Sequence, residues 1–341
     1  MPAGDSNIPA IDIHCHLSTP AATELIQQHY SPAAILAKEP YDLFAGEASR
    51  ARNRELGPTL MPKLSGTEQR VEDMDAMGVD IQVLASFVSQ NYYWTEADLA
   101  SQLMRLQNER IAEARDEHPG RFEALGTIPL QHAASAVAEL EYCVESLGMK
   151  GVQISANVNG DDLDDPRFRP FWKRASELGV VVLIHPSGFT EGRRFDDWFL
   201  TNTLGNPLDS TVALLRLIYS GRLAEFPNLK LVVVHGGGFL PFYWARMDHA
   251  WSNRPEAAVN ISQPPSTYLK QVYFDAMVFD PGLIANLVGF AGHDHVMIGT
   301  DYPFDMGYYD PLGITAQVPG LSPEELAAIQ GGNAARLFGI A

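Results

Sequence analysis

The chain has 341 residues, of which 46% are hydrophobic and 19% are charged, enough apolar material for one large globular domain or two ordinary ones. Acidic residues outnumber Lys and Arg by 42 to 24, which gives a formal net charge of -18. Such a surface repels nucleic acid and anionic membranes, so we expect neither as a partner. A small anionic substrate would need a local cluster of metal and arginine to attract it.

The sequence also lacks the signals of membrane insertion and export. No stretch approaches the roughly 18 unbroken apolar residues of a membrane helix. The first residues, Met-Pro-Ala-Gly-Asp-Ser-Asn, have neither the basic nor the apolar region of a signal peptide. Cys15 and Cys143 are too few for a disulfide framework. We therefore expect a cytoplasmic protein.

Apolar runs alternate with helical patterns along the chain. Most runs are continuously apolar, which is typical of parallel strands buried on both faces. Between them, Asp165-Pro166 begins a helix that Gly179 ends, and Ser322-Pro323-Glu324-Glu325 is a capping box. The predicted strands are residues 10–14, 80–86, 122–128, 150–155, 180–185, 230–235, 272–276 and 295–300.

Eight strand–helix units predict a (β/α)8 barrel of the TIM type, in a single domain of residues 1–341. A doubly wound open sheet is the alternative, but no Gly-x-Gly-x-x-Gly follows the first strand. The connections 17–79 and 186–222 are unusually long. The first contains an insertion at 17–64, without clean periodicity from about residue 30, and a helix at 65–78. Both follow carboxyl ends of strands, so we interpret them as the lid and wall of a pocket; decoration without function is the alternative.

Histidines and an aspartate gather at the carboxyl ends of the predicted strands. On the first strand, His14 and His16 share one face with Asp12 if the side chains alternate. Three imidazoles and a carboxylate, with a position left for water, match a catalytic zinc or a similar divalent metal. The fifth, sixth and eighth strands end in His185, His235 and Asp301.

We expect one metal ion per chain. Two-metal barrels of this kind usually need a carboxylated lysine at the end of the fourth strand. Here that strand ends in Val152-Gln153-Ile154-Ser155, and Lys150 lies at its opposite end.

His235 is the candidate acid–base residue, because it is the rim histidine that metal binding does not require. A divalent ion lowers the pKa of its bound water towards roughly 7, and a nearby base then takes or returns the proton. A role as a fifth ligand is the alternative. Asp12 is expected to support the site or to belong to the packed layers of the barrel, and Cys15 to lie in the core.

Two further features have competing interpretations. His293-Asp294-His295 repeats the spacing of His14 and His16, but it lies at the start of the eighth strand, about 20 Å from Asp301 along an extended chain. We expect a structural or exposed role for this pair. Residues 236–238 are three glycines, which either allow the backbone to approach a ligand closely or make a tight turn into the next helix.

Motifs across nearly the whole chain resemble those of the metal-dependent amidohydrolase superfamily. They are Asp-Ile-His-Cys-His (12–16), Arg-Val-Glu-Asp-Met-Asp-Ala-Met-Gly-Val-Asp (70–80), Ile-His-Pro (184–186), His-Gly-Gly-Gly (235–238), Arg-Met-Asp-His-Ala-Trp (246–251), Gly-Thr-Asp-Tyr-Pro-Phe (299–304) and Gly-Asn-Ala-Ala-Arg-Leu-Phe (332–338). More narrowly, they resemble the branch typified by aminocarboxymuconate-semialdehyde decarboxylase.

This resemblance implies a metal-dependent reaction without an organic cofactor. It implies zinc, or another divalent metal such as manganese, and it implies that His235 acts on the metal-bound water during loss of CO2, with Asp301 as both a ligand and a catalytic residue. The implied metal ligands are His14, His16, His185 and Asp301.

The resemblance also suggests substrate-binding residues and a homodimer. It implies that Arg246 crosses a dimer interface to bind a substrate carboxylate; an ordinary exposed arginine is the alternative. Phe304 and Trp198 match aromatic residues of the family's pocket, although either could be plain packing. A Phe-Arg-Pro motif of the family is missing after the first strand, where Arg50, Arg52 or Arg54 could serve, with Arg54 preferred.

The leading hypothesis is a decarboxylase of an aromatic or muconate-type carboxylic acid. The alternative is a hydrolase that opens a lactone, an amide or a ring C–C bond with the same metal site, because fold and metal do not fix the reaction. A binding protein without catalysis is disfavoured, since every expected ligand and the base are present.

Overall fold

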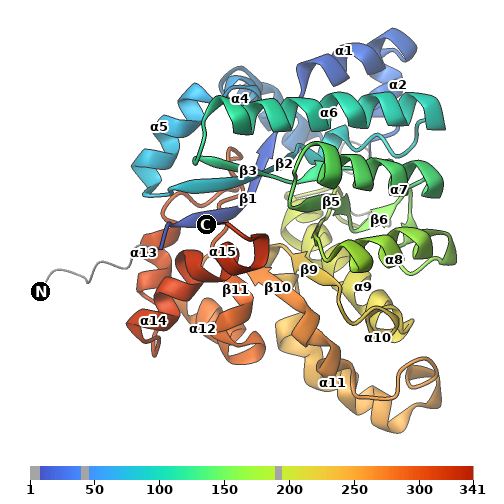
Figure 1. Ribbon diagram of the computed structural model, residues 1–341, viewed down its shortest axis with the longest axis vertical. Helices are drawn as coiled ribbons and strands as arrows, with labels where there is room; N and C mark the ends of the chain where they lie inside the picture. Colours follow the sequence, from blue (N-terminus) through green and yellow to red (C-terminus); the bar gives the residue numbers. More distant parts are fainter. Residues whose placement is uncertain (1–7, 40–45, 189–193, 341) are drawn as a thin grey trace, which may run out of the picture.

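The computed structural model describes residues 8–39, 46–188 and 194–340 (Figure 1). Its parallel strands follow one another around a barrel, in the order β1-β2-β3 and then β4-β5-β8-β9-β10-β11. The strands are β1 (Ile11–Leu17), β2 (Ile81–Ser86), β3 (Phe122–Ala124), β4 (Gly126–Thr127), β5 (Gly151–Ser155), β8 (Val181–His185), β9 (Lys230–Val233), β10 (Val272–Asp275) and β11 (Val296–Met297). A short antiparallel hairpin follows β5, formed by β6 (Asn157–Val158) and β7 (Asp161–Asp162).

Backbone hydrogen bonds close the barrel at the two places where the ladder is interrupted. The amide of Leu125, between β3 and β4, donates to Leu84 of β2 at 2.8 Å. At the other junction Ile13 donates to Ile298 at 3.1 Å, and Cys15 of β1 pairs with Tyr302. The predicted barrel is therefore confirmed, and the eighth predicted strand is shorter than expected.

Helices cover the outside of the barrel (Figure 1). Two predicted boundary signals are confirmed: Gly179 ends α8 in the left-handed conformation, and Ser322 and Glu325 form the capping box of α14. Asp165 caps a 3-10 turn, Pro166–Phe168, that leads into α8, whereas α8 itself begins at Arg169. The α-helices are α1 (Pro20–His29), α2 (Pro32–Leu36), α4 (Glu47–Ser65), α5 (Glu68–Met77), α6 (Ala97–Glu117), α7 (Ala133–Glu141), α8 (Arg169–Leu178), α9 (Asn206–Tyr219), α10 (Arg222–Glu225), α11 (Leu240–Asn253), α12 (Pro281–Ala291), α13 (Pro311–Ala316), α14 (Pro323–Ala327) and α15 (Asn333–Phe338).

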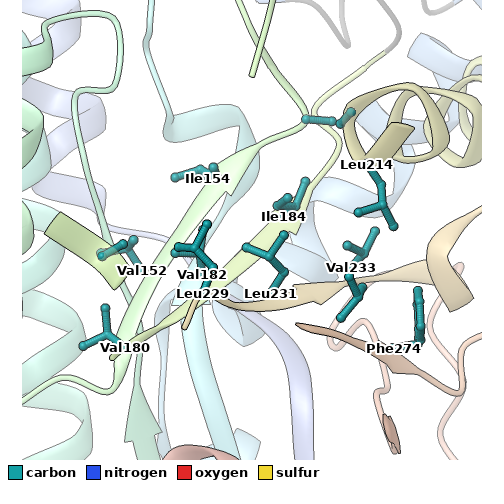
Figure 2. Packing of buried hydrophobic residues seen from close by; sticks show 14 of the residues in the cluster. Val152, Ile154, Val180, Val182, Ile184, Leu214, Leu229, Leu231, Val233 and Phe274 are labelled. Atoms are coloured by element: carbon teal, nitrogen blue, oxygen red, sulfur yellow. The ribbon is translucent and has the colours of Figure 1, made fainter. Parts of the chain in front are cut away.

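Two apolar clusters lie on opposite faces of the sheet. The outer cluster packs strands against helices, and Figure 2 shows part of it, with Ile154, Ile184 and Val233 on neighbouring strands. The inner cluster fills the barrel with side chains such as Val83 and Leu183, and residues of α15 pack against it. Nearly continuous apolar strands are needed because both faces are buried.

Strand β1 does not alternate as the sequence suggests. Ile11 and Ile13 belong to the inner cluster, whereas Cys15 and Leu17 belong to the outer one. The pairing with β2 shifts register between Asp12 and Cys15, as at a β-bulge, which reverses the faces of the following residues. The expectation that Asp12 shares a face with the two histidines of β1 is therefore wrong, while the core position of Cys15 is confirmed.

The connection between β1 and β2 contains four described helices, α1, α2, α4 and α5. Residues 46–64, expected to lack a clean periodicity, fall mostly within α4. This helix contains Pro58 and Pro62 and buries only Leu64, so no apolar stripe marks it in the sequence. Residues 40–45 of the predicted insertion lie outside the described residues.

The second His-x-His sequence also differs from expectation. His293 to His295 form a short 3-10 helix before β11 rather than the start of the strand itself. No described helix combines the length and apolar character needed to cross a membrane.

Candidate metal centre

Four side chains from β1, β8 and the segment after β11 converge at the carboxyl end of the barrel. They are all buried, and one potential ligand atom from each lies within 4.8 Å of the others. The carboxylate oxygen Oδ1 of Asp301 lies 3.1 Å from Nε2 of His16 and 3.3 Å from Nε2 of His14. The four residues are those predicted from the sequence: His14, His16, His185 and Asp301.

The imidazole rings are oriented by hydrogen bonds at the nitrogen that faces away from the centre. Nδ1 of His14 lies 2.6 Å from Oδ2 of Asp275, and Nδ1 of His185 lies 2.6 Å from the carbonyl of Pro186. Nδ1 of His16 lies 3.4 Å from the carbonyl of Ser86. Such bonds fix the tautomer that leaves Nε2 free to bind a metal.

Two of the Nε2 atoms have no partner within the protein: Nε2 of His14 and Nε2 of His185 are buried without a hydrogen bond. Because leaving a buried nitrogen unpartnered costs free energy, these atoms are suited to binding a metal. Three imidazoles and one carboxylate are a donor set that suits zinc and related divalent ions. The residues present therefore fit a resident divalent metal.

The electrostatics of the centre also favour a cation. Burial lowers the pKa of His185 well below its usual value, and burial likewise lowers the pKa of His16. Burial acts in the same direction on His14, but Asp301 and Asp275 outweigh it and raise its pKa to about 10. For Asp301, the surrounding histidines outweigh burial and hold its pKa far below normal. The two carboxylates thus create a demand for positive charge that a divalent ion can meet.

Asp275 is a site residue that our reading of the sequence missed. It ends β10, is fully buried, and accepts a hydrogen bond from the amide of Gly236 at 2.8 Å in addition to its contact with His14. Burial opposes its ionisation, but the bond to His14 outweighs this and lowers the pKa of Asp275. A carboxylate at the carboxyl end of a buried apolar strand was the signal that could have found it.

His235 borders the centre without joining the four converging residues. Its Nε2 lies 3.9 Å from Oδ2 of Asp301, and its ring centroid is 5.1 Å from those of His14 and His185. Its Nδ1 is buried without a hydrogen-bond partner. The residue has a φ of 56°, a conformation that costs energy for a side chain with a Cβ.

The three glycines after His235 make a tight turn that packs against protein. A Cβ on Gly236 would lie 2.5 Å from a methyl of Val278, and one on Gly238 would lie 2.1 Å from the carbonyl of Pro207. Both residues also have positive φ. The structure therefore favours the tight-turn interpretation of residues 236–238.

The predicted substrate-binding residues lie in different settings. The ring of Phe304 is 5.3 Å from that of His16 and 5.6 Å from that of Phe87, so it stands beside the metal ligands. Arg54 is exposed on α4, where it forms an ion pair with Glu47 at 3.1 Å.

Two other predicted binding residues lie at the surface of the described chain. The Trp198 side chain is 85% exposed. Arg246 is exposed on α11 and borders an apolar groove of about 570 Å³ between α9 and α11, lined by residues such as Leu215 and Met247. Neither position by itself places the side chain against the ligands.

The His293–His295 pair has structural contacts instead. His295 stacks on Tyr273 with centroids 4.7 Å apart, and its Nε2 lies 3.2 Å from the carbonyl of Lys270. His293 lies 3.3 Å from Glu325. The expected structural or exposed role is confirmed.

A barrel with three histidines and an aspartate at the carboxyl ends of its strands defines the class of metal-dependent barrel enzymes. Within that class, a family model described as Amidohydrolase matches residues 11–340. The chain therefore belongs to the amidohydrolase family.

Relatives within this family include several decarboxylases. The 2-amino-3-carboxymuconate-6-semialdehyde decarboxylase of Dictyostelium discoideum is 33% identical over 272 residues, which are 80% of this chain and 76% of the relative. Gamma-resorcylate decarboxylase of Rhizobium sp. is 28% identical over 70% of this chain and 77% of the relative. The crystal structure of 5-carboxyvanillate decarboxylase from Sphingomonas paucimobilis matches with a TM-score of 0.83, at 25% identity over 98% of this chain and 100% of the other.

One relative has a different kind of activity. The 2-keto-4-carboxy-3-hexenedioate hydratase of Sphingobium sp. is 27% identical over 68% of this chain and 70% of the relative. Family membership therefore leaves the reaction to be decided by the site.

Proposed function

We propose that this protein is a metal-dependent, non-oxidative decarboxylase of an aromatic or muconate-type carboxylic acid. The observation that carries the proposal is the buried group of His14, His16, His185 and Asp301, with its unpartnered Nε2 atoms, in a chain 33% identical to a decarboxylase of this type. The resident metal is zinc or another divalent ion such as manganese, with one ion per chain.

The chemistry requires one C–C bond to break and one C–H bond to form. A divalent ion held by His14, His16, His185 and Asp301 would supply Lewis-acid stabilisation for the oxygens of the substrate. The carbon that loses CO2 must receive a proton, and we assign the transfer of that proton to His235. Two observations support this role: its Nε2 lies 3.9 Å from Oδ2 of Asp301, and its Nδ1 has no competing partner. Phe304 and Phe87 offer an apolar wall to a planar ring beside His16.

The anionic substrate needs cationic partners, and arginines are the candidates. We place Arg246 at the interface of a homodimer, because it borders the exposed apolar groove of α9 and α11 and a second copy is a natural cover for such a groove. Trp198 and Arg54 belong to the proposed wall and lid, where their exposure leaves them available to a substrate or a partner. Residues 17–64 form the proposed lid.

A substrate screen tests the reaction. Protein reconstituted with zinc, and separately with manganese, is incubated with aminocarboxymuconate semialdehyde, dihydroxybenzoates and 5-carboxyvanillate while CO2 release is followed. We expect CO2 from at least one acid and none after chelation of the metal. Efficient hydrolysis of a lactone or hydration of an unsaturated acid, without CO2 from any acid, would overturn the proposal.

A further inference from the structure

A buried arginine lies behind the metal-binding strand, on the side away from the site. Arg70 of α5 is fully buried. Its Nη1 donates to Oε1 of Gln82 at 3.1 Å, and its Nη2 donates to the carbonyl of His16 and, at 3.3 Å, to that of Lys63. A buried charge is costly unless it is well paired, so this placement needs a compensating role.

Gln82 connects Arg70, through Asp12, to the backbone of the two segments that contain the metal-binding residues. Its Nε2 donates to Oδ2 of Asp12 at 2.9 Å. Oδ1 of Asp12 accepts from the amides of His14 and Thr300, both at 3.0 Å, and its Oδ2 accepts from the Thr300 hydroxyl at 2.6 Å. The network thus holds the backbone of His14 and of Thr300, the residue before Asp301, by hydrogen bonds.

Helix α5 makes a second contact with the segment that carries Asp301. Asp73, one turn after Arg70, accepts a hydrogen bond from the hydroxyl of Tyr302 at 2.7 Å. The guanidinium of Arg70 lies 4.6 Å from the centroid of the Tyr302 ring. The carbonyl of Tyr302 in turn accepts from the amide of His16 at 2.9 Å.

These contacts hold two chain segments that must stay in register for a metal to bind. One segment carries His14 and His16, and the other carries Asp301. Metal–ligand distances tolerate only about 0.2 Å of error. A small movement between the segments would therefore weaken binding without unfolding the barrel.

We propose that Arg70, acting through Gln82 and Tyr302, is a positioning residue that fixes the separation between the β1 histidines and Asp301 and so sets the affinity for the metal. The inference rests on the metal site of the proposed function. It assigns a role to a residue that touches neither the metal ligands' side chains nor the substrate pocket, but only the backbone and supporting groups behind them.

The test compares metal affinity with stability in matched variants. Arg70→Lys replaces the two guanidinium nitrogens that donate to Gln82 and to the His16 carbonyl by a single ammonium group. Tyr302→Phe removes only the hydrogen bond to Asp73. Arg121→Lys is the control, because Arg121 also joins α5 to the start of β2, by way of Asp75 and the Asp80 carbonyl, but its side chain bonds neither to His16 nor to Gln82 or Tyr302. The zinc dissociation constant is measured by competition with a coloured chelator, the Co2+-loaded protein gives a visible spectrum, and the metal-free protein gives a thermal midpoint.

We expect Arg70→Lys to bind zinc about 10- to 100-fold more weakly, as is typical when support behind a metal ligand is removed. Its Co2+ spectrum should shift, and Tyr302→Phe should weaken binding by a few-fold. Arg121→Lys should lower the thermal midpoint and keep the wild-type affinity. Wild-type affinity and spectrum in both Arg70→Lys and Tyr302→Phe would overturn the inference and leave the metal site standing.

Two other outcomes are also decisive. If Arg70→Lys does not fold, Tyr302→Phe decides alone, because it removes a single hydroxyl, the one that donates to Asp73. Wild-type protein that binds no divalent ion would overturn the metal site itself, and with it both the proposed function and this inference.

Discussion

The chain contains the same short motif, His-x-His, twice, and the two copies behave differently. His14 and His16 lie on a buried strand, and their ring nitrogens converge with His185 and Asp301 within 4.8 Å. His293 and His295 lie in a 3-10 helix at the other end of the barrel, where they contact Glu325, Tyr273 and a backbone carbonyl. Spacing alone therefore does not make a metal site; burial and converging partners do.

The sharpest way to test this difference is to remove each pair in turn. We expect His14→Ala/His16→Ala to lose the metal and at least about 1000-fold in kcat/KM, because several kcal/mol of transition-state stabilisation depend on the ion. Metal content by atomic spectrometry and turnover by CO2 release are the measurements. A double variant that keeps its metal would show that the converging atoms are not the ligands.

The next largest effect is expected for His235, which should affect catalysis and not metal binding. His235→Asn should keep the metal and lose about 100- to 10,000-fold in kcat, as expected for a general acid–base residue. The measurement is kcat at a metal content equal to that of the wild type. Loss of the metal in this variant would instead support the fifth-ligand alternative.

Each pair also has an aspartate beside it, and these two carboxylates should differ in the same way. Asp275→Asn removes the charge next to Nδ1 of His14 and should weaken metal binding by about 10- to 100-fold. Asp294→Asn, beside Nδ1 of His295, is the matched control and should leave affinity unchanged. Equal metal affinities in the two variants would show that Asp275 does not support metal binding.

The stability of the metal-free protein should depend on pH through the buried His14. The pKa of His14 is raised to about 10, above the usual value of 6.5, so its contribution to stability is complete below pH 6.5 and is lost as the pH rises towards 10. Thermal midpoints of protein stripped with a chelator should fall over this range. The fall should be smaller in His14→Asn; an identical fall would assign the effect to other groups.

The smallest effect is expected for the second pair. His293→Ala/His295→Ala should keep metal content and kcat, with a stability change of about 1 kcal/mol or less, because exposed ion pairs and single ring contacts contribute little. Denaturant unfolding measures the change. A loss of metal here would contradict the structural role of the pair.

The sequence predicted the barrel and the ligands because both follow from local patterns. Continuous apolar runs identify strands buried on both faces, and the carboxyl ends of parallel strands meet at one rim. The sequence alone therefore predicts that His185 and Asp301 lie beside β1. Asp275 was missed although it ends a strand in the same manner, since a single aspartate after an apolar run is a weak signal.

Other features depend on contacts that no local pattern contains. The bulge in β1 reverses its faces after Asp12, and α4 buries so little that its pattern carries no apolar stripe. Likewise, the sequence shows Arg70 only as one charge in an acidic helix. The tertiary structure reveals that Arg70 is buried against the carbonyl of His16, because the partners of a buried charge come from strands and helices distant in sequence.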